Sequence, residues 1–285
     1  MIKFIIIMTA ALLATPSYAK HKHHRHHKPT TVKKHSTPKA FNQISTWAYD
    51  ITNDVTLQGN GVAVVRPMAS LTKLMTAMVS LDNNSNLSHS HGSRSRESLF
   101  RALLVRSNNE AAETLARNYP GGRAAFLDAM NHKAVTLGML DTHFDDPSGL
   151  IVTNVSTAQD VGHMLMAASR YAEIRRISTY QHLERTQTVQ AKRRTKTVHV
   201  VENNTNAMVL QAFPDIIVSK TGFTNPAGYC VGVVIEQGTS RYAVVVMGAR
   251  NRYDRFDHVK EIMHNNIMTN GHQHRNARYQ VASAD

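Results

Sequence analysis

Strand-like segments stand near both ends of this chain, and a long helical block separates them. Apolar residues recur at helical spacing, with interruptions, from Ser70 to Arg170 and again from Tyr253 to Met268. Short runs rich in Val, Ile, Thr and Tyr occur before and after the block, at 46–51, 55–57, 195–201, 216–221, 229–235 and 242–248. This order predicts an α+β fold: one antiparallel sheet from N- and C-terminal segments, flanked by helices, with an inserted helical lobe.

The first 19 residues have the pattern of a secretory signal peptide. Lys3 precedes an apolar core, Phe4 to Ala14, that is short for a membrane span, and small residues follow at Ser17 and Ala19. We therefore expect cleavage near Ala19 and export to the periplasm. An uncleaved membrane anchor is the competing interpretation of the same residues.

Residues 20–40 predict a disordered, basic, histidine-rich linker. The chain has a net charge of +13 and no acidic residue before Asp50, whereas Lys20 to Lys39 contains seven lysines and arginines and six histidines. Such a tract is a solvated tether or a segment that contacts anionic envelope polymers, and loose metal binding by its imidazoles is a weaker alternative. We expect no nucleic acid partner, because the folded part has no basic patch interleaved with aromatic residues. The tail at 271–285 is polar.

A Ser-x-x-Lys motif opens the helical block. The pattern after Pro67 places Ser70 in the first turn of a buried helix and Lys73 one turn further along the same side. A helix N-terminus stabilises an alkoxide, and a nearby amine with a lowered pKa accepts the hydroxyl proton. Taken alone, the pair also fits a capping serine beside a solvated lysine, so its interpretation depends on the motifs that accompany it.

Two later tripeptides accompany this pair. Ser107-x-Asn109 lies at a break between helices, where polar side chains face a cleft or simply cap the second helix. Lys220-Thr221-Gly222 ends a buried strand, where an ammonium and a hydroxyl suit a carboxylate and a glycine lets a substrate backbone approach the strand edge. An ordinary exit from strand to turn is the alternative for the second tripeptide.

Together, and in this order, the three motifs match the set of the penicillin-binding proteins and serine β-lactamases. The chain resembles the low-molecular-mass penicillin-binding proteins of the serine-type D-Ala-D-Ala carboxypeptidase family, especially the D-alanyl-D-alanine endopeptidase branch. The resemblance implies a β-lactamase/transpeptidase-like catalytic domain over residues 41–270. Its text spans roughly Ile44 to Met268 and includes Arg66-Pro67-x-Ala69-Ser70-x-Thr72-Lys73-Leu74-Met75-Thr76-Ala77-Met78, Tyr119-Pro120-Gly121-Gly122, Pro147-x-Gly149-Leu150, Asn154-x-Ser156-Thr157-Ala158-x-Asp160 and Lys220-Thr221-Gly222-Phe223-Thr224-Asn225-x-Ala227-Gly228.

The resemblance implies a serine peptidase that acts on D-Ala-containing peptides of peptidoglycan through an acyl-enzyme at Ser70. Lys73 would be the general base, and Ser107 would relay a proton to the departing amine. Backbone N–H groups of Ser70 and Phe223 would form the oxyanion hole. The implied substrate-binding residues are Asn109, Lys220, Thr221, Gly222 and Phe223. No metal or cofactor is implied, and β-lactams would acylate Ser70 and leave slowly.

Cleavage of peptide cross-links by an endopeptidase is our leading expectation, and removal of a terminal D-Ala by a carboxypeptidase is the alternative. Ser107 follows Ser70 by only 37 positions, and Asn83 to Arg96 is predicted to be a polar loop without the strand-like insert that normally borders the cleft. The stretch after Lys220 is long enough to finish the sheet but not to add the C-terminal β-domain and anchor of other carboxypeptidases. The short stretch after Lys220 favours the endopeptidase type.

Two further alternatives remain. A class A β-lactamase shares the three motifs but needs a deacylating glutamate, in a Glu-x-x-x-Asn context, on a loop between the second and third. Glu202 with Asn206 has that spacing, yet it follows a strand close to Lys220, so we interpret the match as chance. A non-catalytic envelope-binding module is disfavoured by the three intact motifs.

Overall fold

The structure is a computed structural model that describes residues 43–91, 94–191, 194–213 and 215–268, all within one compact unit. The predicted signal peptide at 1–19, the basic linker at 20–40 and the polar tail at 271–285 lie outside the described residues. None of the helices in the described ranges combines the length and the hydrophobicity that a membrane span needs.

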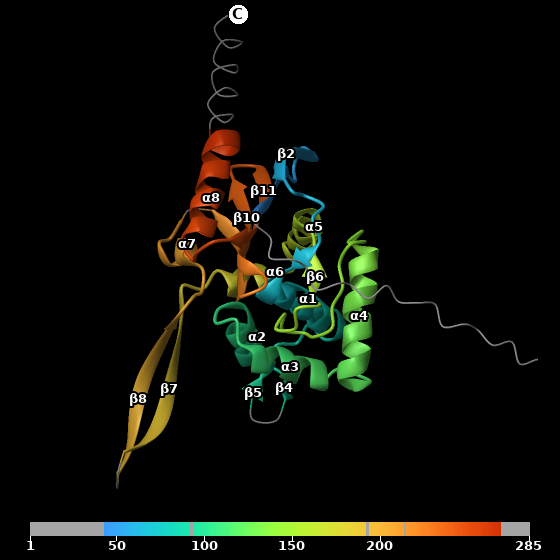
Figure 1. The fold of residues 1–285 in the computed structure, drawn as a ribbon. Helices are drawn as coiled ribbons and strands as arrows, with labels where there is room; N and C mark the ends of the chain where they lie inside the picture. The colour runs from blue at the N-terminus through green and yellow to red at the C-terminus, as the bar shows by residue number, and fades with distance from the viewer. Residues whose placement is uncertain (1–42, 92–93, 192–193, 214, 269–285) are drawn as a thin grey trace, which may run out of the picture. The chain divides into compact units, whose positions relative to one another are not determined.

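A five-stranded antiparallel sheet joins the two ends of the described chain (Figure 1). Strand β1 pairs with β11 in a register that sets Ser45 opposite Met247 and Asp50 opposite Tyr242. The predicted α+β fold, with a sheet built from N- and C-terminal segments, is therefore confirmed, and β9 forms one edge of the sheet. In spatial order the strands are β2 (Val55–Asn60), β1 (Ser45–Asp50), β11 (Ser240–Ala249), β10 (Gly228–Gln237) and β9 (Ile216–Thr224).

Each face of the sheet buries its own hydrophobic cluster, because side chains alternate along every strand. Along β10, Val231 and Val233 belong to the cluster beneath helix α8 (Asp254–Met263). Cys230 and Val234, which are out of phase with them, belong to the larger cluster on the opposite face. Burial stabilises each large apolar side chain of α8 by about 1.5–3 kcal/mol; these are Phe256, Val259, Ile262 and Met263.

The helices of the middle segment pack on that opposite face and form the inserted lobe (Figure 1). Helix α1 (Lys73–Asn83) crosses the centre of the lobe and is buried without interruption from Lys73 to Leu81, as expected for a helix with neighbours on all sides. Those neighbours are α2 (Arg96–Leu104), α3 (Asn109–Arg117), α4 (Gly122–Thr136) and α5 (Ala158–Ala168). Side-chain caps begin α2, α3 and α5, at Ser95, Asn108 and Thr157.

Short elements connect the sheet to the lobe. Strand β3 (Arg66–Pro67) pairs with β6 (Val155–Ser156) just before the 3₁₀ turn η1 (Ala69–Thr72). Ser70 therefore lies in a 3₁₀ turn that leads directly into α1, rather than in the first turn of the α-helix itself. The remaining short elements are α6 (Ala172–Ser178), α7 (Ala207–Leu210) and a π-helical turn, η2 (His264–Met268).

Residues 195–201 do not join the sheet, contrary to the sequence expectation. They belong to β8 (Arg194–Asn203), which pairs with β7 (His182–Ala191) to form a separate two-stranded ribbon. Figure 1 shows this β7–β8 ribbon extending away from the sheet and the lobe. Strand β7 was not predicted because its sequence, HLERTQTVQA, lacks the apolar alternation of a half-buried strand.

The segment from Asn83 to Arg96 contains two short strands. Strand β4 (Ser90–His91) pairs with β5 (Arg94–Ser95) immediately before α2, so the prediction of a loop without strands is wrong. The pairing rests on backbone hydrogen bonds between polar residues that bury no apolar face, and it therefore leaves no period-2 pattern in the sequence.

Candidate active site

The three predicted motifs come together where η1, α1, the start of α3 and strand β9 meet. Lys73 Nζ lies 2.8 Å from Ser70 Oγ and 2.8 Å from Asn109 Oδ1. Lys220 Nζ lies 2.9 Å from Ser107 Oγ. The contact between Lys73 and Asn109 joins the first motif to the second, and the contact between Lys220 and Ser107 joins the second motif to the third. The three sequence motifs therefore occupy one site.

Three oxygen atoms surround the buried ammonium group of Lys73. Besides Ser70 Oγ and Asn109 Oδ1, the backbone carbonyl of Ser148 accepts a hydrogen bond from Nζ at 2.6 Å. The amide and carbonyl oxygens can only accept, whereas a hydroxyl can donate or accept. A neutral amine has two hydrogens for the two obligate acceptors and one lone pair left for the Ser70 hydroxyl. The geometry thus suits transfer of the Ser70 proton to Lys73.

Burial lowers the pKa of Lys73 to about 7. Removal from water disfavours the ammonium form, and the negative charge of Asp146 opposes part of that effect. A substantial fraction of Lys73 is therefore the neutral amine near pH 7, which is the form able to accept a proton.

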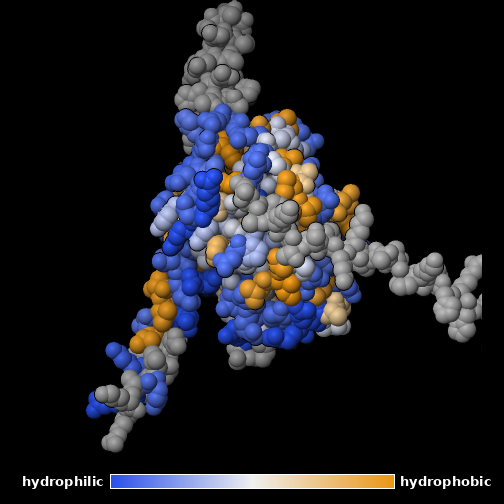
Figure 2. Space-filling model, viewed as in Figure 1, coloured by the Kyte–Doolittle hydropathy of each residue, from blue (hydrophilic) through white to orange (hydrophobic). Residues whose placement is uncertain are grey.

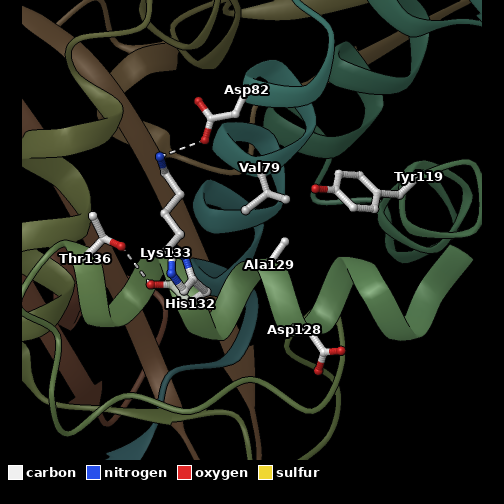
Figure 3. Close-up of a pocket in the computed structure, with 8 residues that line it drawn as sticks. All are labelled: Val79, Asp82, Tyr119, Asp128, Ala129, His132, Lys133 and Thr136. Carbon is white, nitrogen blue, oxygen red and sulfur yellow. Dashed lines mark hydrogen bonds and ion pairs between the residues drawn. The ribbon is translucent and has the colours of Figure 1, made fainter. Parts of the chain in front are cut away.

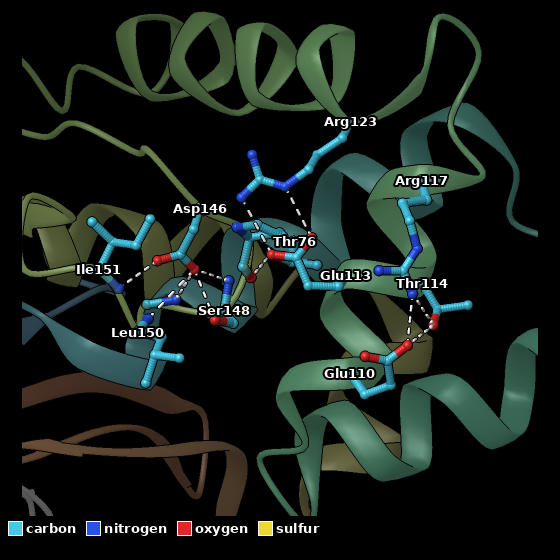
Figure 4. Close-up of polar contacts among 12 residues, drawn as sticks. Thr76, Glu110, Glu113, Thr114, Arg117, Arg123, Asp146, Ser148, Leu150 and Ile151 are labelled. Carbon is cyan, nitrogen blue, oxygen red and sulfur yellow. Dashed lines mark hydrogen bonds and ion pairs between the residues drawn. The ribbon is translucent and has the colours of Figure 1, made fainter.

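The loop that carries Ser148 is held by one carboxylate (Figure 4). Asp146 is buried, and it accepts hydrogen bonds from the backbone N–H groups of Ser148, Gly149, Leu150 and Ile151 as well as from the Ser148 hydroxyl. Gly149 has a φ of +79°, and a Cβ atom there would lie 1.9 Å from the carbonyl oxygen of Ala69. The loop therefore packs directly on the turn of Ser70, and only glycine fits at this position.

Lys220 is the second buried lysine of the site. Its Nζ donates to Ser107 Oγ and, at 2.7 Å, to the Thr221 carbonyl. The pKa of Lys220 lies well below the usual value because the group is removed from water and because Lys73 and Arg255 add positive charge nearby. No carboxylate lies among its hydrogen-bond partners in the described part of the chain. An anion bound here would favour the charged form.

Strand β9 presents the Lys-Thr-Gly motif at the edge of the sheet, beside the turn of Ser70. A Cβ atom at Gly222 would lie 3.1 Å from the backbone nitrogen of Ser70, so the strand passes close to the predicted nucleophile. The Thr221 hydroxyl donates to Thr205 Oγ1 at 2.7 Å. Phe223 is 47% exposed and stacks on Tyr229 with 4.2 Å between ring centroids. An edge strand of this kind can bind an extended peptide by strand addition.

A cleft of about 540 Å³ opens at these residues, and it is strongly basic. It is lined by three arginines and by no aspartate or glutamate, so it favours an anionic ligand. Arg106, Arg252, Arg255 and Thr205 were not identified from the sequence, because they stand outside the motifs and come together only in the fold. The lining residues are Ser70, Arg106, Ser107, Asn203, Asn204, Thr205, Leu210, Thr221, Gly222, Phe223, Tyr229, Arg252 and Arg255.

A second pocket, between α1 and α4, shares no residue with this cleft (Figure 3). Its charged groups bind one another: Lys133 Nζ lies 2.8 Å from Asp82 Oδ2, and the Tyr171 hydroxyl donates to Asp82 Oδ1 at 2.6 Å. The residues that line it are Val79, Asp82, Tyr119, Asp128, Ala129, His132, Lys133 and Thr136. None of the three motifs contributes to this pocket.

Glu202 does not occupy the position of a deacylating glutamate. It lies within β8, where its carboxylate pairs with Arg106 at 3.6 Å and with Arg185 at 3.2 Å. Asn206 is buried, donates to Ser219 Oγ and caps α7. The Glu-x-x-x-Asn spacing therefore belongs to two residues with separate structural contacts.

Structures of similar fold include a bacterial DD-transpeptidase and a bacterial penicillin-binding protein. The DD-transpeptidase of Streptomyces K15 superposes with a TM-score of 0.67 and 25% identity, over 77% of this chain and 94% of that one. Penicillin-binding protein D2 of Listeria monocytogenes, in its cefotaxime-bound form, gives a TM-score of 0.65 and 28% identity, over 77% of this chain and 95% of that one. The β-lactamase/transpeptidase-like fold is therefore confirmed.

Sequence comparison identifies the family. The Peptidase S11 profile, described as D-alanyl-D-alanine carboxypeptidase, matches residues 80–251. A D-alanyl-D-alanine endopeptidase of Escherichia coli K12 is 36% identical over 227 residues, which cover 73% of this chain and 71% of that protein. One of Pseudomonas aeruginosa is 38% identical over 213 residues, or 68% of this chain and 67% of that protein. The chain belongs to the S11 family of peptidases, the D-alanyl-D-alanine carboxypeptidases.

Proposed function

We propose that this protein is a serine DD-peptidase that cleaves D-Ala-containing peptides of peptidoglycan through an acyl-enzyme at Ser70. The observation that carries the proposal is the environment of Lys73, whose two obligate acceptors leave the amine lone pair for the Ser70 hydroxyl. A capping serine beside a solvated lysine, the other interpretation of this motif, would leave the lysine in water. Here the lysine is fully buried.

In the acylation step, Lys73 takes the Ser70 proton while Ser70 Oγ attacks the carbonyl carbon of the penultimate D-Ala. Backbone N–H groups of Ser70 and Phe223 stabilise the oxyanion of the tetrahedral intermediate. The C–N bond then breaks, and the departing amine receives the proton that Lys73 took from Ser70, relayed through the hydroxyl of Ser107, which Lys220 holds in place. Water hydrolyses the resulting ester and restores Ser70.

Strand β9 binds the substrate beside the nucleophile. Lys220 and Thr221 hold the carboxylate of the leaving residue, and the pKa of Lys220 rises when this anion enters the basic cleft. Gly222 allows close approach of the substrate backbone, and Asn109 holds a substrate amide while it positions Lys73. These roles use every site residue that the sequence predicted.

We further propose that the bond cleaved is a peptide cross-link, which makes the protein an endopeptidase. The two relatives described above support this, since both carry the name D-alanyl-D-alanine endopeptidase. Purified cross-linked and uncross-linked muropeptides, digested by the mature protein and identified by mass, test the preference. Release of monomers from cross-linked dimers is expected, and exclusive loss of terminal D-Ala would establish a carboxypeptidase instead.

The same site is expected to be acylated at Ser70 by β-lactams, which then leave slowly, because their strained amide mimics the D-Ala-D-Ala bond. Fluorescent penicillin should label the wild-type protein, and Ser70→Ala should abolish the label. An unlabelled wild-type protein would favour a non-catalytic binding module. Rapid turnover of nitrocefin would favour a β-lactamase, which the separate contacts of Glu202 and Asn206 make a poor fit.

We propose that the protein acts in the periplasm after cleavage near Ala19, and that the linker at 20–40 contacts anionic envelope polymers. The support is the sequence of these residues together with a peptidoglycan substrate. Mass measurement of the exported protein tests the cleavage site. A chain that retains residues 1–19 would favour the membrane anchor.

A further inference from the structure

The β7–β8 ribbon is long for an element that packs against so little of the protein. Two strands of ten residues each pair only with one another in the described structure, and most of their described side chains are exposed. An isolated two-stranded ribbon is at best marginally stable in water. Hydrophobic and hydrophilic residues lie side by side along it in Figure 2, so burial in the core does not account for its length.

The ribbon carries its cationic side chains on one face. In antiparallel pairing, residues opposite one another share a face, and every second residue along a strand returns to it. The register sets Arg185 opposite Val200 and Glu202 opposite Leu183, so Arg185, Glu202, Lys196 and Arg194 all lie on the same face. No described lysine or arginine of the ribbon lies on the other face, four of whose ten residues are threonine.

This cationic face leads directly into the active-site cleft. Glu202, at the base of β8, pairs with Arg185 of the ribbon and with Arg106, which lines the cleft beside Ser107. Arg106 also donates to the carbonyl of Asn203, the last residue of β8. The two arginines share a single carboxylate, so the junction keeps a net positive charge. Beyond it, Lys196 and Arg194 have no acidic partner among the described residues.

We propose that this face of the β7–β8 ribbon is an extended binding surface for the carboxylate-bearing peptides of peptidoglycan, which it holds while one peptide occupies the cleft. The inference rests on the proposed function. The eight residue-to-residue steps from Glu202 to Arg194 span about 26 Å, which is well beyond the reach of a single dipeptide. Uncleaved stem peptides of the same polymer end in free carboxylates, and these complement Lys196 and Arg194, the two cations of this face that have no acidic partner among the described residues.

An isolated small substrate would gain nothing from the ribbon, because it fits within the cleft. A polymer gains a second point of attachment, and the tethered peptide then meets the active site at a raised effective concentration. The ribbon therefore contributes to affinity for the polymer and leaves acylation of Ser70 by small molecules unchanged.

The test uses two double variants of the mature chain, each of which removes two positive charges. Arg194→Gln/Lys196→Gln alters the ribbon, and Arg117→Gln/Lys260→Gln alters exposed cations of α3 and α8. Binding to insoluble, purified peptidoglycan is measured by co-sedimentation in a Ser70→Ala background, so that no digestion occurs. Thermal unfolding midpoints, and penicillin labelling of the same charge variants with Ser70 intact, check that the fold is retained.

We expect the ribbon variant to need at least about fivefold more peptidoglycan for half-maximal binding at low ionic strength, and the control variant to match the wild type. The difference should shrink as salt screens the charges. Equal binding by the two variants would overturn the proposal, because net charge or the cleft alone would then explain the attachment. Loss of binding to vesicles rich in phosphatidylglycerol, with peptidoglycan binding unchanged, would assign the ribbon to the membrane surface instead.

Failure of the proposed function has a different outcome. A protein that is no DD-peptidase would show no penicillin label on wild-type Ser70 and no cleavage of muropeptides, whatever the ribbon binds. If the wild-type protein is labelled and the ribbon variant binds peptidoglycan normally, the proposed peptidase function stands and only the ribbon proposal fails.

Discussion

Two buried lysines with different partners divide the chemistry of the site. Lys73 has two obligate acceptors and one hydroxyl, which is the set that suits a proton acceptor. Lys220 has a hydroxyl and a single carbonyl, and positive charge surrounds it. In the proposed mechanism, a negative substrate group completes the environment of Lys220, whereas Lys73 must lose its charge before it can accept a proton.

The rate of acylation should follow the titration of Lys73. Its pKa is lowered to about 7 by burial, and only the deprotonated amine accepts the Ser70 proton. The rate constant for labelling by penicillin should therefore rise with pH through about 7 and level off above it. Stopped-flow labelling across this range measures the profile.

Lys73→Arg provides the control for this profile, since a guanidinium stays protonated at every accessible pH. Labelling should be lost throughout the range. A wild-type rate that is constant from about pH 5.5 to 8.5 would show that Lys73 is not the titrating base.

Thr205 should determine how well the substrate carboxylate is held. Its hydroxyl accepts from Thr221 at 2.7 Å, and its N–H donates to the carbonyl of Val105, so it links β9 to the loop of Ser107. Thr205→Val removes one hydrogen bond at constant shape and should raise KM by about two- to tenfold with little change in kcat. Thr205→Ser should restore KM; an equal fall in kcat for both variants would instead indicate a general disturbance of the loop.

The motif residues of this site could be predicted from the sequence because each motif is local. Ser70 and Lys73 are one turn apart, and Lys220 to Phe223 are consecutive. Asp146 and Ser148 were visible only as part of a turn-rich run, and Arg106 and Arg255 belong to no motif. Their places depend on contacts between distant segments, which no local spacing reveals.

At the scale of elements, the loop of Asp146 packs directly on the turn that carries Ser70. One carboxylate replaces the hydrogen-bond partners that four backbone N–H groups would otherwise find in water. It also fixes the Ser148 carbonyl against Lys73. Asp146 alone therefore fixes the shape of this loop and, through its charge, influences the pKa of Lys73.

Asp146→Asn tests both effects at once. The amide has only one acceptor oxygen, so the Ile151 N–H loses its charged partner, and the free energy of unfolding should fall by about 1.5–3 kcal/mol. Loss of the negative charge should lower the pKa of Lys73 further, because Asp146 raises it in the wild type. Denaturant unfolding measures the first effect.

The midpoint of the labelling profile measures the second effect, and it should move to a pH below that of the wild type. Asp146→Ala removes every acceptor and should cost more stability than Asp146→Asn. A midpoint that moves upward would contradict the electrostatic role of Asp146.

Elements with a buried face were predicted, whereas the exposed strands were predicted unevenly: β2 and most of β8 were expected, but β7 and the pair β4–β5 were not. The strands β1, β10 and β11 have apolar residues that pack against helices, and these residues form the patterns from which the strands were predicted. The ribbon strand β7 and the pair β4–β5 bury little, so their sequences follow no hydrophobic period.

At the scale of the whole molecule, the sheet is the part that both hydrophobic clusters share. Its central strands are covered on both faces, by α8 on one side and by the helical lobe on the other. The active site lies where β9, the edge strand, meets the lobe. A loss of packing on either face of the sheet should therefore destabilise the site, because the same strands form both faces.

Two neighbouring residues of β11 test this dependence. Val244 belongs to the cluster beneath α8, Val245 belongs to the lobe cluster, and both are fully buried. Val244→Ala and Val245→Ala each remove two methyl groups and leave a cavity, so each should lower the free energy of unfolding by about 1–3 kcal/mol. Because the two clusters share one sheet, each variant should shift a single unfolding transition and the loss of penicillin labelling by the same amount. The alternative result is two separate unfolding transitions, with penicillin labelling lost in the transition that Val245→Ala shifts. It would show that the face beneath α8 unfolds independently of the site.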